Sequence, residues 1–211
     1  AELTLRAGRN ELRAEGLPPI PFNYGSGTNI DIGTRTTRLS VLNLTYRRLF
    51  AQGWFAGIGE TTYTQRTDWT NIPPGWYEST DQGFIPINGH ESEYSRVAGL
   101  RLEAGRTISL GPVRLEAAAG LTPSMHGNDN LSIHTYPICT ANGCAPQDRP
   151  FTHAEDAAQV DAYARLARRV AHNGDLLLGL RYINYTAHYA NGTLADRNVG
   201  WAPTVGYRIR L

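Results

Sequence analysis

The chain has 211 residues, a formal net charge of +1 and 18% charged side chains. This length suits a single domain, and the nearly neutral charge argues against a nucleic-acid-binding protein. No run of 18 or more apolar residues occurs, which excludes a membrane-spanning helix. All 20 lysine and arginine positions hold arginine, whose planar guanidinium suits paired contacts with carboxylates.

Eight segments alternate apolar with polar side chains, as β-strands with two different faces do. In chain order they cover about 2–13, 34–48, 53–67, 93–107, 112–124, 157–170, 175–188 and 199–211. Three connections are short, and one of them contains Asn173-Gly174, a strong hairpin-turn signal. The other four connections are predicted to be long surface loops, at about 14–33, 68–92, 125–156 and 189–198.

Short turns at one end and long loops at the other are typical of bacterial outer-membrane β-barrels. Strands of this length, rising about 3.3 Å per residue and tilted by roughly 45°, cross about 30 Å of hydrocarbon. We therefore predict that residues 1–211 form one all-β domain, an eight-stranded antiparallel up-and-down transmembrane β-barrel. Both chain ends are expected on the periplasmic side of the outer membrane, with the loops extracellular.

The last strand shows the two predicted faces, because Val205, Tyr207 and Ile209 alternate with residues that include Arg208 and Arg210. An arginine on the lipid face costs about 2–4 kcal/mol at the midplane, so the charged face is assigned to the lumen. Eight strands enclose a lumen barely wide enough for side chains, so these charges should pair and block it. The predicted lumen residues are Glu2, Arg6, Glu60, Arg101, Glu103, Arg114, Glu116, Asp161, Arg165, Arg181 and Arg208.

The facing of three strands, 34–48, 53–67 and 175–188, stays open at this point. One phase of these strands would place Val41, Leu177 or Ile183 inside the lumen. An ion path lined by the same charges is the alternative to a blocked lumen, although unpaired charges in so narrow a space are costly.

The only two cysteines, Cys139 and Cys144, flank an Asn142-Gly143 turn. The turn brings the sulfurs close together and no histidine lies at ligand spacing, so we predict a disulfide formed in an oxidising compartment. Two free thiols are the alternative. The histidines show no recognised metal-ligand spacing, so no metal or other cofactor is predicted.

The predicted loop 68–92 is rich in aromatic residues, among them Trp69, Trp76, Tyr77 and Phe84. Exposed tryptophan and tyrosine are the usual anchors of protein interfaces. These four residues are therefore candidates for binding a surface protein partner. Packing on each other or on lipid headgroups is the alternative.

The whole pattern resembles the small eight-stranded outer-membrane barrel proteins of Gram-negative bacteria. The closing segment from Gly206 to Leu211 is similar to their C-terminal assembly signal, in which the last residue is usually phenylalanine. The resemblance implies contact with outer-membrane lipid and lipopolysaccharide, and insertion by the barrel-insertion machinery through the C-terminal strand. Such barrels include adhesins, structural proteins, lipid-modifying enzymes and small-solute channels.

The segment His188-Tyr189-Ala190-Asn191 resembles the His-Tyr-Ser-Asn motif of the lipid A 3-O-deacylases. Those enzymes use a serine, a histidine and a glutamate, but here Ala190 and Ala202 occupy the positions of the serine and the glutamate. Ester hydrolysis by that route needs a hydroxyl beside its base. The chain is therefore predicted not to be an enzyme.

The predicted function is a barrel with a plugged lumen that displays surface loops for a structural, adhesive or partner-binding role. The alternatives are a lipid-modifying enzyme of the lipid A deacylase type and a narrow small-solute channel. A soluble eight-stranded ligand carrier is a further alternative, and it would require apolar residues on the inside.

Overall fold

The computed structural model describes the backbone of residues 2–22, 34–75, 77–80, 83–140, 143–192 and 194–210. Side chains are described in these ranges except at 17–22, 34–37, 39, 77–80, 83–84, 137–140, 143–147 and 196. The described residues form an all-β structure with a single 3-10 turn, η1 (Ala51–Gly53). No helix within these ranges is long and apolar enough to cross a membrane.

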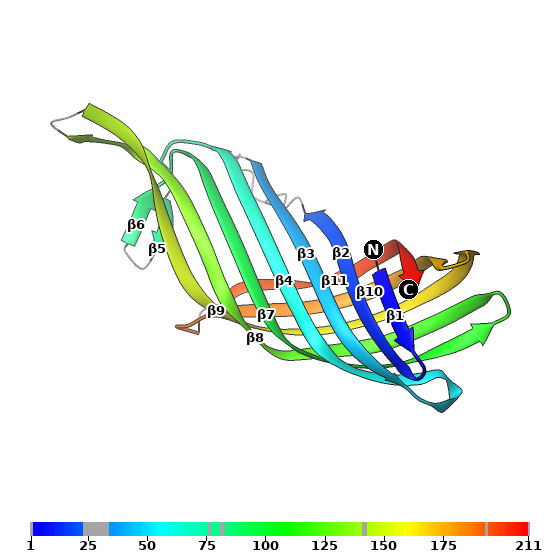
Figure 1. The fold of residues 1–211 in the computed structure, drawn as a ribbon. Coiled ribbons are helices and arrows are strands. Elements are labelled where there is room, and N and C mark those ends of the chain that lie inside the picture. Colours follow the sequence, from blue (N-terminus) through cyan, green and yellow to red (C-terminus); the bar gives the residue numbers. More distant parts are fainter. Residues whose placement is uncertain are drawn as a thin grey trace.

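One large sheet closes into a ring in the order β1-β11-β10-β9-β8-β7-β4-β3-β2 (Figure 1). Its strands are β1 (Glu2–Ala7), β2 (Asn10–Phe22), β3 (Thr34–Leu49), β4 (Trp54–Ile72), β7 (Gly89–Leu110), β8 (Val113–Thr140), β9 (Gly143–Ala171), β10 (Gly174–Tyr189) and β11 (Leu194–Arg210). A separate two-stranded sheet consists of β5 (Tyr77–Thr80) and β6 (Gly83–Pro86). All neighbouring strands are antiparallel except β1 and β11, which pair in parallel.

The ring has nine strands where the sequence predicts eight, because the segment 2–13 folds into a hairpin. The chain turns at Gly8, whose φ of 60° lies in the left-handed region that favours glycine. After this turn β2 runs back along β1, and β1 also pairs with β11 over the three residues from Glu2 to Thr4. The ring is therefore closed by a short parallel contact between the two ends of the chain.

Most of the predicted loops are strands in the structure. β8 and β9 are 28 and 29 residues long and continue through most of 125–156, forming the long hairpin at the upper left of Figure 1. β4 and β7 likewise extend into 68–92, and β10 and β11 leave only four residues, 190–193, between them. The predicted loop 14–33 begins with β2, and residues 23–33 lie outside the described part of the chain.

A β-bulge between Thr122 and Met125 divides β8 into two parts. We call the parts of β8 and β9 beyond it, residues 125–140 and 143–157, the extension. Five buried apolar side chains form what we call the upper core, with Trp69 packed against them: Ile72, Ile85, Ile87, Ile133 and Phe151. The polar residues that suggested loops face outward from these strands, as exposed Asn128 and Asn130 do.

Large apolar side chains cover the outer surface of the ring. Val205 on this surface is 73% exposed, whereas Arg101 on the inner surface is 1% exposed. We call the outward set the apolar belt: Leu3, Leu5, Leu12, Leu42, Leu44, Ile58, Leu100, Leu102, Leu121, Val160, Leu166, Leu176, Leu178, Leu180, Trp201, Val205 and Ile209. In the strands whose facing was open, Val41 and Leu177 are buried inside and Ile183 is partly buried.

The two cysteines lie directly opposite each other, because the register of β8 and β9 pairs Cys139 with Cys144. Their side chains are outside the described part of the structure. The predicted disulfide stays a prediction.

Candidate functional site in the lumen

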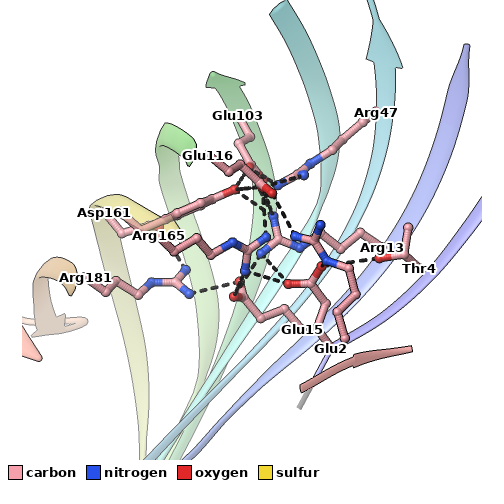
Figure 2. Close-up of polar contacts among 12 residues, drawn as sticks. Glu2, Thr4, Arg13, Glu15, Arg47, Glu103, Glu116, Asp161, Arg165 and Arg181 are labelled. Atoms are coloured by element: carbon pink, nitrogen blue, oxygen red, sulfur yellow. Dashed lines mark hydrogen bonds and ion pairs between the residues drawn. The ribbon is translucent and has the colours of Figure 1, made fainter. Parts of the chain in front are cut away.

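Inward-facing charged side chains from eight strands meet in the half of the ring nearest its short turns (Figure 2). Alternation along each strand brings them to one face, and closure of the ring points that face inward. We call the following set the lumen charge network: Glu2, Arg13, Glu15, Arg47, Arg101, Glu103, Glu116, Asp161, Tyr163, Arg165, Arg181 and Arg208.

Glu116 on β8 lies at the centre of the network and is almost fully buried. Its Oε1 accepts hydrogen bonds from Arg13 at 3.2 Å, Arg47 at 3.1 Å and Arg165 at 2.8 Å. Its Oε2 accepts one from Arg208 at 2.7 Å. One carboxylate therefore joins arginines from four other strands, β2, β3, β9 and β11.

The Tyr163 hydroxyl lies beside the same carboxylate. It accepts hydrogen bonds from Arg13 Nη1 at 2.7 Å and from Arg47 Nη2 at 2.8 Å. Its single proton has two acceptors within reach, Glu116 at 2.7 Å and Glu103 at 3.1 Å. A hydroxyl has one proton and two lone pairs, so this one is fully used.

Further ion pairs extend the network to the sides. Asp161 accepts hydrogen bonds from Arg101 and, at 2.9 Å, from Arg181. Arg181 also donates to Glu15 at 2.9 Å, and Glu15 pairs with Arg13 at 2.9 Å. A Cβ at Gly120 would lie about 2.1–2.5 Å from the Arg101 guanidinium, so glycine at this position makes room for it.

Glu2 links the network to the closing contact of the ring. It accepts hydrogen bonds from Arg165 at 2.6 Å and from Arg208, and it pairs with Arg13 at 2.9 Å. The Arg208 contact joins β11 to β1, which are the parallel pair that closes the ring. The charge network therefore holds together the two ends of the chain.

The balance of charge decides what this lumen can do. Taking one partner out of a buried ion pair leaves an uncompensated charge and costs about 3–5 kcal/mol. Each carboxylate in the network contacts at least one arginine at hydrogen-bond distance, so every negative charge in it is paired. Such paired charges join the strands of the ring across its interior.

A second layer lies above the network. The rings of Tyr63 and Tyr185 stack at a centroid distance of 3.7 Å, and Val97 and Met125 are buried in the same cluster. Tyr185 donates a hydrogen bond to Glu155 at 3.1 Å. Aromatic and apolar side chains are therefore buried in the lumen above the charges.

Asp129 and Tyr189 lie further up, in the extension and at the end of β10. The Tyr189 hydroxyl donates a hydrogen bond to Asp129 Oδ2 at 3.0 Å. Burial raises the pKa of the Asp129 carboxyl, and this hydrogen bond partly opposes the shift. Burial and the neighbouring Asp129 carboxylate also raise the pKa of Tyr189.

The structure brings together most of the residues predicted for the lumen. Arg101, Glu103, Glu116, Asp161, Arg165, Arg181, Arg208 and Glu2 belong to the network. Arg114 is partly exposed near its edge, where it donates to Asp175 at 2.6 Å.

Two residues predicted for the lumen lie elsewhere. Arg6 is exposed at the end of β1, and its Nε donates to the Gly8 carbonyl at 3.3 Å. Glu60 is exposed on the outer surface, in register with Leu44 and Leu100 of the apolar belt. Placing Glu60 in the lumen is wrong because it shares its face of β4 with the outward-facing residues of that strand.

Sequence reasoning missed five residues at this site, namely Arg13, Glu15, Arg47, Tyr163 and Asp175. The alternation in 157–170 could have found Tyr163, which shares a face with Asp161 and Arg165. The neighbours of Arg47 could not have identified it, because the next residue is also an arginine and is exposed.

The other predicted sites are placed as follows. Trp69 packs against the upper core, and Trp76 and the side chains of Tyr77 and Phe84 lie outside the described part of the structure. His188 is exposed on β10, and Ala202 on β11 is in register with Arg181. Within the described residues, no group of three histidine, cysteine or acidic side chains could hold a metal ion.

No protein-family model matches the chain. No curated protein matches it significantly either.

Proposed function

We propose that the chain is an outer-membrane β-barrel with a closed lumen, which holds a rigid sheet extension at the cell surface. One observation carries the proposal: the inner surface of the ring is charged and paired, while its outer surface is mainly apolar, with Glu60 as a charged exception. A soluble barrel that carries a ligand would have the reverse distribution. Water outside the ring would leave the apolar belt exposed, whereas lipid would cover it.

The length of the apolar belt along β9 fits the thickness of a membrane. Outward-facing Asp156 and Arg168 are both exposed, and the outward positions between them are apolar, as at Val160 and Leu166. Residues 157–167 lie between these two charges, which matches the roughly 9–11 residues that a tilted strand uses to cross a bilayer. We expect the short turns on the periplasmic side and the extension outside the cell.

The closed lumen favours a structural or partner-binding role over a small-solute channel. The extension and the β5–β6 hairpin are held by the upper core, and segments held on a rigid framework are common binding sites. The expected partners are outer-membrane lipid and lipopolysaccharide, the barrel-insertion machinery acting on β11, and a surface protein.

Three measurements test this proposal. The protein should fractionate with outer membranes, and the unheated form should migrate faster on a denaturing gel than the boiled form. Reconstituted into planar bilayers, it should give no steady conductance, with a wide porin as the positive control. A protein that stays monomeric and soluble without detergent would contradict the membrane position, and large reproducible channels would contradict the closed lumen.

A further inference from the structure

Ser124, His126 and Asp156 form a continuous hydrogen-bonded row on the outer surface of the ring. Ser124 Oγ lies 2.9 Å from His126 Nε2, and His126 Nδ1 lies 2.5 Å from Asp156 Oδ1. A hydroxyl on one imidazole nitrogen and a carboxylate on the other is the arrangement by which hydrolases activate a serine. We propose that these residues hydrolyse acyl esters of membrane lipids, with Ser124 as the nucleophile.

The bulge in β8 creates this arrangement. Inward positions below it have even numbers, such as Glu116 and Thr122, so simple alternation would also turn Ser124 inward. The extra residue reverses the phase, so Met125 is buried while Ser124 and His126 are exposed on the outer face. Bulges often re-aim side chains in this way next to active sites.

Strand pairing completes the row. The register of β8 and β9 places Asp156 directly opposite His126, so the carboxylate reaches Nδ1 from the neighbouring strand. This contact fixes the ring with Nδ1 protonated and leaves Nε2 free to accept the Ser124 proton. Pro123 and Ser124 lie in the bulge, outside the registers of β8 with both neighbouring strands.

The position of the row identifies the class of substrate. Ser124 lies just beyond Leu121 and Val160, which are in register with each other at the upper edge of the apolar belt. At this height a lipid has its acyl ester groups, with the acyl chain along the belt and the headgroup toward water. Exposed Arg96 and Asn128, in the next outward row above His126, can hold an anionic or hydroxylated headgroup.

The reaction balances with water as the only co-reactant. Ser124 Oγ attacks the ester carbon as its proton passes to His126 Nε2. The ester C–O bond then breaks, the departing alcohol takes that proton, and the acyl group remains on Ser124. Water attacks the acyl carbon with His126 again accepting a proton, and the fatty acid leaves as the Ser124 hydroxyl is restored.

The activity differs from the one suggested by the His188 motif. His188 is also in register with Asp156, but from β10 on the opposite side. The structure supplies His126 with a hydroxyl partner in Ser124, whereas the motif has Ala190 in the place of its serine. The prediction that the chain is not an enzyme depends on Ala190 and Ala202. It does not apply to the row of Ser124, His126 and Asp156.

The test uses the folded protein in detergent micelles and a fluorophosphonate probe that reacts with activated serines. We expect the probe to label Ser124, and fatty acid to be released from either diacyl glycerophospholipid or lipid A, assayed separately to identify the lipid. Ser124→Ala and His126→Ala should lower the rate at least about 100-fold, and Asp156→Asn should also lower it strongly.

The matched control is His134→Ala. His134 forms a similar pair with Asp148, at 2.7 Å, between the same two strands in the extension, and its loss should leave the rate unchanged. Each variant must keep the faster migration of the unheated form, which separates loss of activity from loss of folding. Absence of labelling, absence of release from both lipids, or release that survives Ser124→Ala would overturn the proposal, as would a requirement for His188 instead of His126. None of these outcomes would affect the proposed barrel.

Discussion

The ring and the extension distribute their side chains in opposite ways along the same strand. In the lower part of β8, charged Glu116 faces inward and Leu121 faces outward. Beyond the bulge, apolar Ile133 faces inward while Asn128 faces outward. The bulge between Thr122 and Met125 therefore marks a change in the polarity of the inward-facing and outward-facing side chains as well as a change of phase.

Inward-facing side chains are buried in both regions, but they are charged in the ring and apolar in the extension. The upper core forms because water outside the extension favours burying apolar side chains, at about 25 cal/mol per Å². Lipid around the ring would offer no such advantage, since acyl chains solvate leucine as well as a core does. The ring is then held by its strand ladders and by the charge-assisted hydrogen bonds of the lumen charge network.

Glu116→Gln should have the largest effect. It tests whether the lumen charge network stabilises the ring. The change removes one negative charge from four arginines that converge on it. We expect the free energy of unfolding to fall by about 3–5 kcal/mol, because buried cations lose their counter-charge. Urea titration in lipid vesicles, followed by the mobility of unheated samples, measures this change.

Glu60→Gln is the matched control for that variant. Glu60 lies on the outer surface, where its Oε1 accepts a long 3.4 Å hydrogen bond from Thr62. Neutralising it should leave the protein at least as stable. Equal destabilisation by both variants would mean that the inner network has no special role.

Leu178→Arg tests whether the outer surface of the ring faces lipid. Leu178 is 57% exposed on β10, and an arginine in the middle of a lipid-facing surface costs about 2–4 kcal/mol. The variant should lose that much stability in vesicles, whereas Asn128→Arg, on the outer face of the extension, should lose almost none. Equal stability of the two variants would contradict the membrane position of the belt.

Ile133→Val tests whether apolar packing in the upper core stabilises the extension. Ile133 is fully buried in the upper core, and loss of one methylene from such a site costs about 0.5–1.5 kcal/mol. Hydrogen exchange should become faster in the extension and remain unchanged near Glu116. Equal acceleration in both regions would show that the two parts unfold as one unit.

Much of the ring could be predicted from the sequence, because alternation with a period of two determines faces wherever it is unbroken. The strands 93–107, 112–124 and 157–170 placed Arg101, Glu116 and Asp161 correctly on the inner face. The turn at Gly8 was missed although the alternation breaks there, because Arg9, Asn10 and Glu11 are consecutive polar residues and Leu12 is in the opposite phase. Glu60 was misplaced because the phase of its strand was left open by the sequence.

The extension and the serine row depend on information that the sequence does not display locally. Strands surrounded by water carry polar outward residues, so the asparagine-rich parts of β8 resembled loops. Ser124 and His126 face outward only because of the bulge, and Asp156 reaches His126 only through the register of β8 and β9. Neither the site of a bulge nor a register between distant segments follows from alternation alone.

The smallest predicted effect concerns Asp129, which is buried and charged in a region otherwise stabilised by apolar packing. Because burial raises its pKa, the folded extension binds this proton more tightly than the unfolded chain does. The resulting stabilisation is fully present below the ordinary aspartate pKa of about 3.9 and is lost as pH rises through the raised value. The carboxyl resonance of Asp129, followed by NMR, should therefore titrate above the ordinary range.

Tyr189→Phe sharpens this prediction. The Tyr189 hydroxyl donates the 3.0 Å hydrogen bond that favours the charged form of Asp129, so removing it should raise the pKa of Asp129 further. The extension should then lose its stability at a higher pH than in the unaltered protein. Hydrogen exchange measures this loss, after correction for the intrinsic dependence of exchange on pH. Asp129→Asn should weaken the dependence, because the amide does not titrate. A lowered Asp129 pKa in Tyr189→Phe would mean that the hydroxyl stabilises the protonated carboxyl, and the assignment of donor and acceptor in this pair would have to be reversed.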